Sequence, residues 1–217
     1  MIVVIQCAGT KRKHAGHLQT RDGKSVLFVA DPAAAHGSDT FICARPDDPS
    51  DQAISWRDYL VQYNETPWNN PFGLLPAYEL YEREIYRTLA NRIGINKTFI
   101  LSAGWGMIPA PFLTPSYDIT FSPRTDPSKR RKKHETWPDL SMLPADTNEP
   151  IIFLGGKDYL PLFLRLTAHV SSPRTIFYNS VNAPNAPDCR VVRFETRTKT
   201  NWHYECASKL LSGQVGP

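Results

Sequence analysis

An aromatic residue and a carboxylate, Tyr117 and Asp118, stand next to each other in the segment that runs from residue 99 to residue 121. An aromatic ring can hold a nucleobase, and a carboxylate can orient water and stabilise the positive charge that develops on a sugar when its bond to a base breaks. The pair makes Asp118 the first candidate catalytic residue, with Tyr117 as a contact to the base. The alternative interpretation is an exposed aspartate beside a half-buried tyrosine.

Small or polar residues follow each of four short apolar runs, and such runs are typical of buried parallel strands. The runs are 2–6, 97–101, 151–154 and 175–178, and the residues that follow them are 7–10, 102–104, 155–158 and 179–180. The carboxyl ends of parallel strands meet at one edge of a sheet, where open α/β proteins bind ligands. We therefore expect these four loops to form one site.

The alternation of these strands with helical patterns predicts an α/β fold. We expect a single domain, residues 1–217, with a mostly parallel four-stranded central sheet flanked by helices. Helices are expected at 55–63, 76–93, 159–169 and 202–211, and an edge strand at 191–194. Two proline-rich stretches, 19–75 and 122–149, are interpreted as irregular insertions. Within the first, short strands at 26–30 and 40–43 are suited to a hairpin.

The loop 155–158 precedes a predicted helix, and the N-terminus of a helix favours anions. Lys157 and Asp158 are therefore expected to bind substrate, with a phosphate group close by. The alternative is a tight turn in which Asp158 only caps the helix. Cys7 is the one cysteine singled out, because it ends the first strand, although a small buried residue is the simpler interpretation.

Two basic runs, 11–14 and 129–134, stand out in a chain of 217 residues whose formal net charge is only +4. Basic runs commonly neutralise phosphates, so DNA is the expected partner, either double- or single-stranded. The alternative is a pair of solvated loops that bind nothing. The residues expected to contact DNA are Lys11, Arg12, Lys13, Arg130, Arg131 and Lys132.

Several function classes are excluded by missing motifs. The chain lacks a P-loop, a dinucleotide fingerprint and a nucleophile elbow, so no cofactor is expected. Its four cysteines are far apart and no His/Cys/Asp group has metal spacing, so no metal is expected. We expect no membrane association and a cytoplasmic location, because no apolar run is long enough to span a bilayer and no signal peptide is evident.

Three blocks of the sequence resemble the YaaA-like superfamily of bacterial, archaeal and phage proteins. They are PAYELY at 76–81, LSAGWGMIP at 101–109 followed by the Tyr117-Asp118 pair, and LGGKDYL at 154–160. The opening strand with Cys7 and Lys11 also fits the common start of that superfamily. The blocks cover roughly half of the chain, and the two proposed insertions depart from the compact pattern.

That superfamily is similar in turn to the uracil-DNA glycosylase fold, and the resemblance implies roles for three strand ends. Gln6 and Cys7 fall where those enzymes carry a Gln-Asp pair that positions water. Ser102 falls where they carry an asparagine that reads the base, and Asn179 where they carry the histidine of a loop that meets DNA. Because Cys7 replaces the aspartate and Asn179 the histidine, Asp118 has to supply the carboxylate.

The resemblance implies a DNA glycosylase-like enzyme that hydrolyses the N-glycosidic bond of a modified base. Some anti-phage enzymes of this broad type excise glucosylated cytosines from viral DNA, and large insertions around a pocket would suit so bulky a base. Asp118 and Asn179 are then catalytic, and Trp105 and Tyr117 contact a flipped base. The alternatives are a non-catalytic DNA-binding stress protein of the YaaA type and a hydrolase or transferase acting on free nucleosides.

Overall fold

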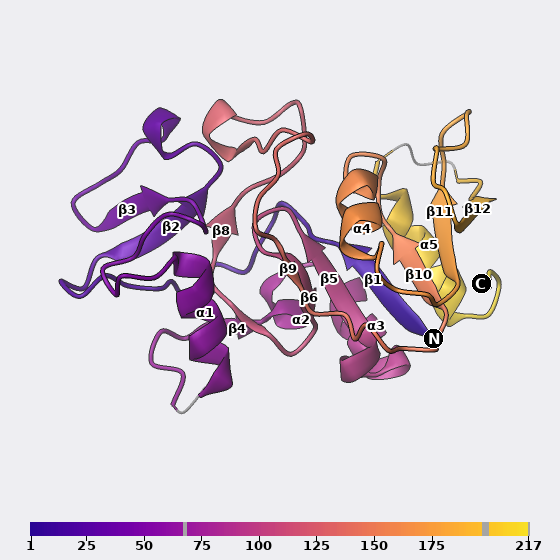
Figure 1. The fold of residues 1–217 in the computed structure, drawn as a ribbon, viewed down its shortest axis with the longest axis horizontal. Helices are drawn as coiled ribbons and strands as arrows, with labels where there is room; N and C mark the ends of the chain where they lie inside the picture. The colour runs from indigo at the N-terminus through magenta and orange to yellow at the C-terminus, as the bar shows by residue number, and fades with distance from the viewer. Residues whose placement is uncertain (67–68, 197–199, 217) are drawn as a thin grey trace.

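Five neighbouring parallel strands, starting from one edge, make up most of the main sheet in the computed structural model, which describes residues 1–66, 69–196 and 200–216 (Figure 1). The strand order is β12-β11-β10-β1-β5-β6-β9, with β6 antiparallel to β5 and β9 parallel to β6. Their bounds are β12 Cys189–Arg193, β11 Arg174–Tyr178, β10 Ile151–Leu154, β1 Ile2–Gln6, β5 Thr98–Ser102, β6 Gly106–Pro109 and β9 Leu140–Ser141. The predicted mixed α/β chain with a large, mostly parallel sheet and flanking helices is confirmed.

The predicted number of four strands is wrong, because this sheet has seven. The four predicted strands are β1, β5, β10 and β11, and they are adjacent to one another. β6 was missed because it reverses direction immediately after β5, at Gly106, which has a positive φ of 92°. The 191–194 strand is confirmed as an edge strand, β12.

The position of β1 determines where a ligand can enter. β1 pairs with β5 on one side and with β10 on the other, and both pairings are parallel. The chain therefore leaves β1 in one direction to reach β5 and later returns to the opposite side of β1 to form β10. At such a switch point the adjoining loops diverge above the sheet and leave a crevice at the carboxyl ends of the strands.

Helices cover both faces of the main sheet. α3 (Ile85–Ile93) packs on β1 and β5 and against α5 (Trp202–Leu211), which itself packs on β10. α4 (Leu160–Leu166) lies in front of the sheet in Figure 1, and α5 lies behind it. The predicted helix 202–211 is confirmed at both of its ends, and the predicted helix 55–63 corresponds to α1 (Trp56–Glu65), whose N-cap is Ser55.

Two helix predictions need correction. The single helix expected at 76–93 is two helices, α2 (Ala77–Leu80) and α3, because Tyr81 is extended and its backbone forms a bridge with Lys11. Asp158 does not cap α4: the N-cap is Tyr159, which makes no side-chain capping bond, and the Asp158 carboxylate pairs with Lys133 instead.

A second, three-stranded parallel sheet, β3-β2-β8, lies beside the main sheet (Figure 1). It consists of β2 (Ser25–Val29), β3 (Phe41–Ala44) and the two-residue β8 (Tyr117–Asp118). The hairpin expected from β2 and β3 is wrong, because the connection through the short helix η1 (Pro32–Ala34) returns the chain to a parallel register. The remaining elements are β4 (Leu75–Pro76), β7 (Leu113–Thr114), η2 (Ile95–Lys97) and η3 (Pro127–Lys129).

Candidate functional site

A crevice crosses the carboxyl ends of β1, β10 and β11, and it consists of two adjoining cavities. The cavity nearer β1, of about 320 Å³, is lined by the loop after β1, the loop after β10 and the start of α5. The cavity nearer β11, of about 290 Å³, is lined by the loops after β10 and β11. We call them the β1-side cavity and the β11-side cavity. Both are lined by Gly156, Asp158 and Trp202, so these three residues mark their junction.

The loops after β1 and β10 are joined by side-chain contacts inside the β1-side cavity. The Gln6 side-chain oxygen Oε1 accepts a hydrogen bond from the Gly156 backbone N–H at 2.6 Å. The Cys7 sulfur lies 3.2 Å from the Tyr159 hydroxyl. Burial raises the pKa of Tyr159 well above its usual value, so this hydroxyl stays protonated and can donate. These contacts hold the walls of the cavity in place beyond the ends of β1 and β10, where the chain leaves the two strands in different directions.

The first turn of α5 supplies the polar side chains that the sequence analysis missed. Asn201, the N-cap, has a positive φ of 61°, and its side chain makes no capping bond. His203 is only 4% exposed, and burial lowers its pKa to about 4. The sequence analysis treated every histidine as structural or surface. The available signal was the polar Asn201 at the start of a predicted amphipathic helix.

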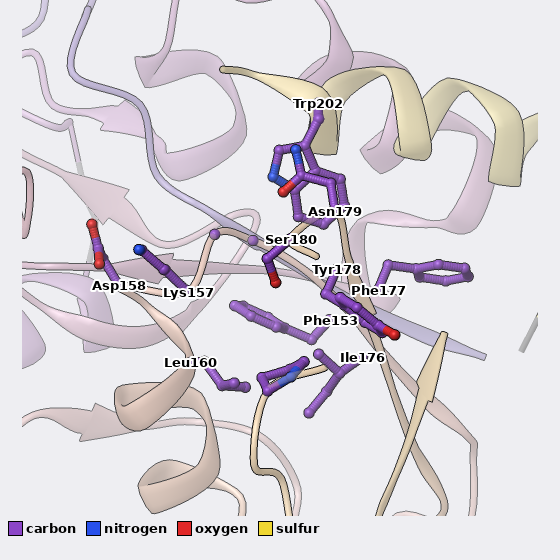
Figure 2. Close-up of a pocket in the computed structure, with 13 residues that line it drawn as sticks. Phe153, Lys157, Asp158, Leu160, Ile176, Phe177, Tyr178, Asn179, Ser180 and Trp202 are labelled. Atoms are coloured by element: carbon purple, nitrogen blue, oxygen red, sulfur yellow. The ribbon is translucent and has the colours of Figure 1, made fainter. Parts of the chain in front are cut away.

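The β11-side cavity combines an apolar wall with polar groups. Figure 2 shows Phe153, Leu160 and Ile176 gathered on one side of it, and Lys157 and Asp158 close together at its edge. Asn179 and Ser180 line it from the loop after β11. The structure therefore brings together five residues that the sequence placed in the site, two of them on the β1 side, two on the β11 side and one at the junction. They are Gln6, Cys7, Lys157, Asp158 and Asn179.

Asp158 is the carboxylate of this crevice. Its side chain is 25% exposed, and it forms an ion pair with Lys133 of the basic segment 129–134. This pair connects the crevice to the largest group of basic residues in the sequence. An ionised carboxylate at the junction of two cavities can stabilise positive charge on a bound molecule that spans both.

The end of β5 is closed by protein side chains, in contrast to the ends of β1 and β10. Ser102, Trp105 and Tyr117 are all at most 1% exposed. The Ser102 hydroxyl donates to the Tyr117 hydroxyl at 2.9 Å and accepts the backbone N–H of Trp105 at 3.1 Å. The Tyr117 hydroxyl also lies 2.8 Å from that of Tyr81. Burial leaves Ser102, Trp105 and Tyr117 no surface for a ligand.

Two buried arginines bind the carbonyl groups of the turn between β5 and β6. Arg57 of α1 donates to the carbonyls of Gly104 at 3.0 Å and Trp105 at 2.9 Å. Arg131 donates to the carbonyl of Ala103 at 2.8 Å and makes two bonds of 2.6 Å to Asp139. Arg131 is 1% exposed and its guanidinium lies over the Trp137 ring, so the structure places this residue, expected to contact DNA, inside the protein.

Asp118 lies apart from the crevice, on β8. Its carboxylate is 37% exposed and forms an ion pair of 2.6 Å with Lys129. It lines neither of the two crevice cavities. The Lys11 ammonium lies 4.0 Å from the centre of the Tyr117 ring, and burial lowers its pKa. Asp118 is thus paired with Lys129 on the edge strand of the second sheet, with the Lys11 ammonium close enough to interact with it electrostatically.

The other residues expected to bind DNA differ in their exposure. Lys13, Arg130 and Lys132 are exposed, and Arg12 is half-buried and paired with Glu79 at 3.5 Å. Lys133, which the sequence analysis included only as part of the basic run, is also exposed. The segment 129–134 therefore presents several cations to solvent while Arg131 anchors it from within.

Comparison of the chain with family models, curated proteins and solved structures finds no match. Across the described parts of the chain, no group of three or more histidine, cysteine, aspartate and glutamate residues could hold a metal ion. None of the described helices is long and apolar enough to cross a membrane. The chemical assignment of the crevice therefore depends on its own residues.

Proposed function

We propose that the protein is a DNA glycosylase-like enzyme that hydrolyses the N-glycosidic bond of a modified base in DNA. The observation that carries the proposal is the position of Asp158. Its carboxylate lies where the two cavities meet, at the switch point of a mostly parallel sheet, and it is paired with Lys133 of the basic segment 129–134. The resemblance of the strand-end motifs to the YaaA-like superfamily and the uracil-DNA glycosylase fold supports the same class of reaction.

The chemistry requires a negative charge beside the sugar. As the bond between C1′ and the base nitrogen breaks, the base leaves with the electron pair and the sugar acquires positive charge. Asp158 stabilises that charge and orients water. The water oxygen then bonds to C1′, and a proton from the water passes to the departing base, so that one water is consumed. We place Asp158 in this role in preference to Asp118, because Asp118 lies outside the crevice.

The basic segment supports a polymeric substrate. Arg130 and Lys132 are exposed in the same segment as Lys133, which reaches the crevice through its ion pair with Asp158. Cations in such a segment can hold the phosphates that flank an extruded nucleotide. An enzyme that acts on a base in a duplex has to flip that base into a pocket, and such contacts stabilise the flipped state. A free nucleoside would leave these residues without a role, so we favour DNA over that alternative.

The test is an abasic-site assay on duplex and single-stranded oligonucleotides that carry ordinary, hydroxymethylated or glucosylated cytosine, or uracil. Alkali cleaves the strand wherever a base has been released. We expect Asp158→Asn to lower the rate of release about 100- to 1,000-fold, as is typical for the loss of one preorganised electrostatic group. Asp118→Asn is the matched control, a carboxylate paired with a lysine outside the crevice, and we expect it to stay within about threefold of the wild type.

Each other outcome selects a different interpretation. A large loss in Asp118→Asn with full activity in Asp158→Asn would return the catalytic role to Asp118. Binding of DNA without release of any base would favour the non-catalytic DNA-binding protein. Release from free nucleosides but not from oligonucleotides would favour a nucleoside hydrolase. Absence of release from every substrate would contradict the proposal.

A further inference from the structure

We infer that the β1-side cavity is the pocket for the nucleobase itself, and that His203 hydrogen-bonds to the edge of that base. The choice of ligand class rests on the proposed function. The inference adds which half of the crevice takes the base and which side chain reads it. His203, Asn201 and the first turn of α5 thereby become part of the site.

His203 lines this cavity, and one of its ring nitrogens lacks a hydrogen-bond partner among the described residues. The residue lines the β1-side cavity and is 4% exposed, and its Nε2 has no hydrogen-bond partner among the described residues. Buried polar atoms in folded proteins nearly always have a hydrogen-bond partner, because a buried donor or acceptor without one lowers the stability of the fold. The other described atoms of this kind belong to Trp105, Arg131 and Asp158. Trp105 and Arg131 line neither cavity, and Asp158 is paired with Lys133, so His203 is the residue at which a ligand can supply a missing hydrogen bond.

The two cavities differ in charge, and the difference orients the ligand. Asp158 is the one ionised side chain among the described residues that line the β1-side cavity, and Lys133 balances its charge. With no cation inside, this cavity suits an uncharged polar group and disfavours phosphate. The β11-side cavity contains Lys157, which suits an anion. A nucleotide would therefore place its base on the β1 side and its phosphate on the β11 side, with the sugar beside Asp158.

The other lining residues suit a planar ring with polar edges. Tyr159, Trp202 and Tyr204 contribute aromatic rings to the β1-side cavity. Flipped bases are held by stacking on such rings and by hydrogen bonds to their edges. His203 is neutral near pH 7, because burial lowers its pKa to about 4, so its ring offers one donor and one acceptor. The Asn201 amide, which does not cap α5, adds a second group of both kinds.

The experiment measures binding without cleavage. Protein labelled with ¹⁵N in its histidine rings is titrated with free nucleosides: deoxycytidine, 5-hydroxymethyldeoxycytidine, thymidine, deoxyadenosine and deoxyguanosine. The control ligand is 2-deoxyribose 5-phosphate, which has no base. We expect at least one nucleoside to shift the His203 Nε2 resonance, and the sugar phosphate to leave it unchanged.

Variants test whether that contact contributes affinity. His203→Phe keeps a ring but removes the hydrogen-bonding atoms, and we expect about tenfold weaker nucleoside binding by calorimetry. His203→Gln restores a donor and an acceptor and should recover part of the loss. His169→Phe changes an exposed histidine beyond the end of α4 and should bind as the wild type does.

The outcomes separate this inference from the proposed function. It is overturned if no nucleoside shifts His203, if the sugar phosphate shifts it equally, or if folded His203→Phe binds as tightly as the wild type. The titration of the wild-type protein decides the matter even if His203→Phe does not fold. A nucleoside-dependent shift without any base release from DNA would retain the pocket and remove the glycosylase. Base release from DNA with no nucleoside-dependent shift of His203 would retain the glycosylase and remove His203 from the base pocket.

Discussion

The loop after β5 and the loop after β10 have similar residues and opposite surroundings. Both begin with small residues, at 102–104 and at 155–156, and both follow a buried parallel strand. The first is covered by side chains from the second sheet and from α1, and two buried arginines occupy its carbonyl groups. The second lines two cavities.

Glycine shows the same difference at atomic scale. A Cβ on Gly104 would lie 3.1 Å from the Ile119 side chain and 3.3 Å from that of Tyr117. A Cβ on Gly156 would meet nothing closer than the Gln6 side-chain oxygen at 3.5 Å. Small residues after a strand therefore permit close approach in both loops. At Gly104 the neighbouring groups are the side chains of Ile119 and Tyr117. Of the two glycines, Gly156 is the one that leaves space for a ligand.

The largest expected effect is a loss of stability when the covering of the loop after β5 is disturbed. Arg131→Met leaves the Ala103 carbonyl without its buried donor, while Asp139 keeps only its ion pair with Arg165, so we expect the free energy of unfolding to fall by about 3 kcal/mol, the lower end for breaking a buried ion pair. Urea unfolding measures this loss. Lys132→Met changes the exposed neighbour and should stay within about 0.5 kcal/mol of the wild type. Equal, small losses in both variants would show that Arg131 is free to contact DNA.

The next effect concerns the open end and its pH dependence. The pKa of His203 is about 4 in the folded protein and near 6.5 when unfolded. Between these values the unfolded chain binds the extra proton, so stability falls as pH drops from 6.5 to about 4. A difference of this size corresponds to about 3 kcal/mol. Unfolding measured across this range should show that loss in the wild type and in His169→Phe, and lack it in His203→Phe. Parallel curves for all three would contradict the buried, neutral histidine.

A smaller effect tests the two glycines directly. Gly104→Ala forces a methyl group against Tyr117 and Ile119, and overpacking of this kind costs about 1–3 kcal/mol of unfolding free energy. Gly156→Ala adds its methyl group to open space in the crevice, so stability should change by less than about 1 kcal/mol while substrate binding weakens. Thermal unfolding and binding measured on both variants give the comparison. A stability loss in Gly156→Ala equal to that in Gly104→Ala would argue against an open crevice.

The smallest effect concerns the cations beside the crevice. Arg130→Ala combined with Lys132→Ala removes two exposed charges, and the slope of log affinity for DNA against log salt should become shallower by about two. The matched control is Lys97→Ala with Lys209→Ala, which removes two lysines that line neither cavity of the crevice. Fluorescence anisotropy with a labelled duplex at several salt concentrations measures the slope. An unchanged slope would place the segment outside the DNA interface.

Much of the fold could be predicted because its signals are local. Continuous apolar runs identified β1, β5, β10 and β11, and helical periodicity identified α5 with both ends correct. The break between α2 and α3 was not visible, because periodicity continues through Tyr81 while a bridge to Lys11 holds that residue extended. The parallel pairing of β2 and β3 could not be predicted either, because parallel and antiparallel strands are compatible with the same alternation of residues.

By itself, the sequence determined which residues end the parallel strands, and it thereby placed Gln6, Cys7, Lys157, Asp158 and Asn179 at one edge of the sheet. Only the tertiary structure decided that Asp158 lies in the crevice, that Asp118 and Tyr117 do not, and that His203 joins from α5. The physical reason is the range of the interactions. A strand and its ending depend on neighbours in the chain, whereas the covering of β5 depends on packing by segments tens of residues away.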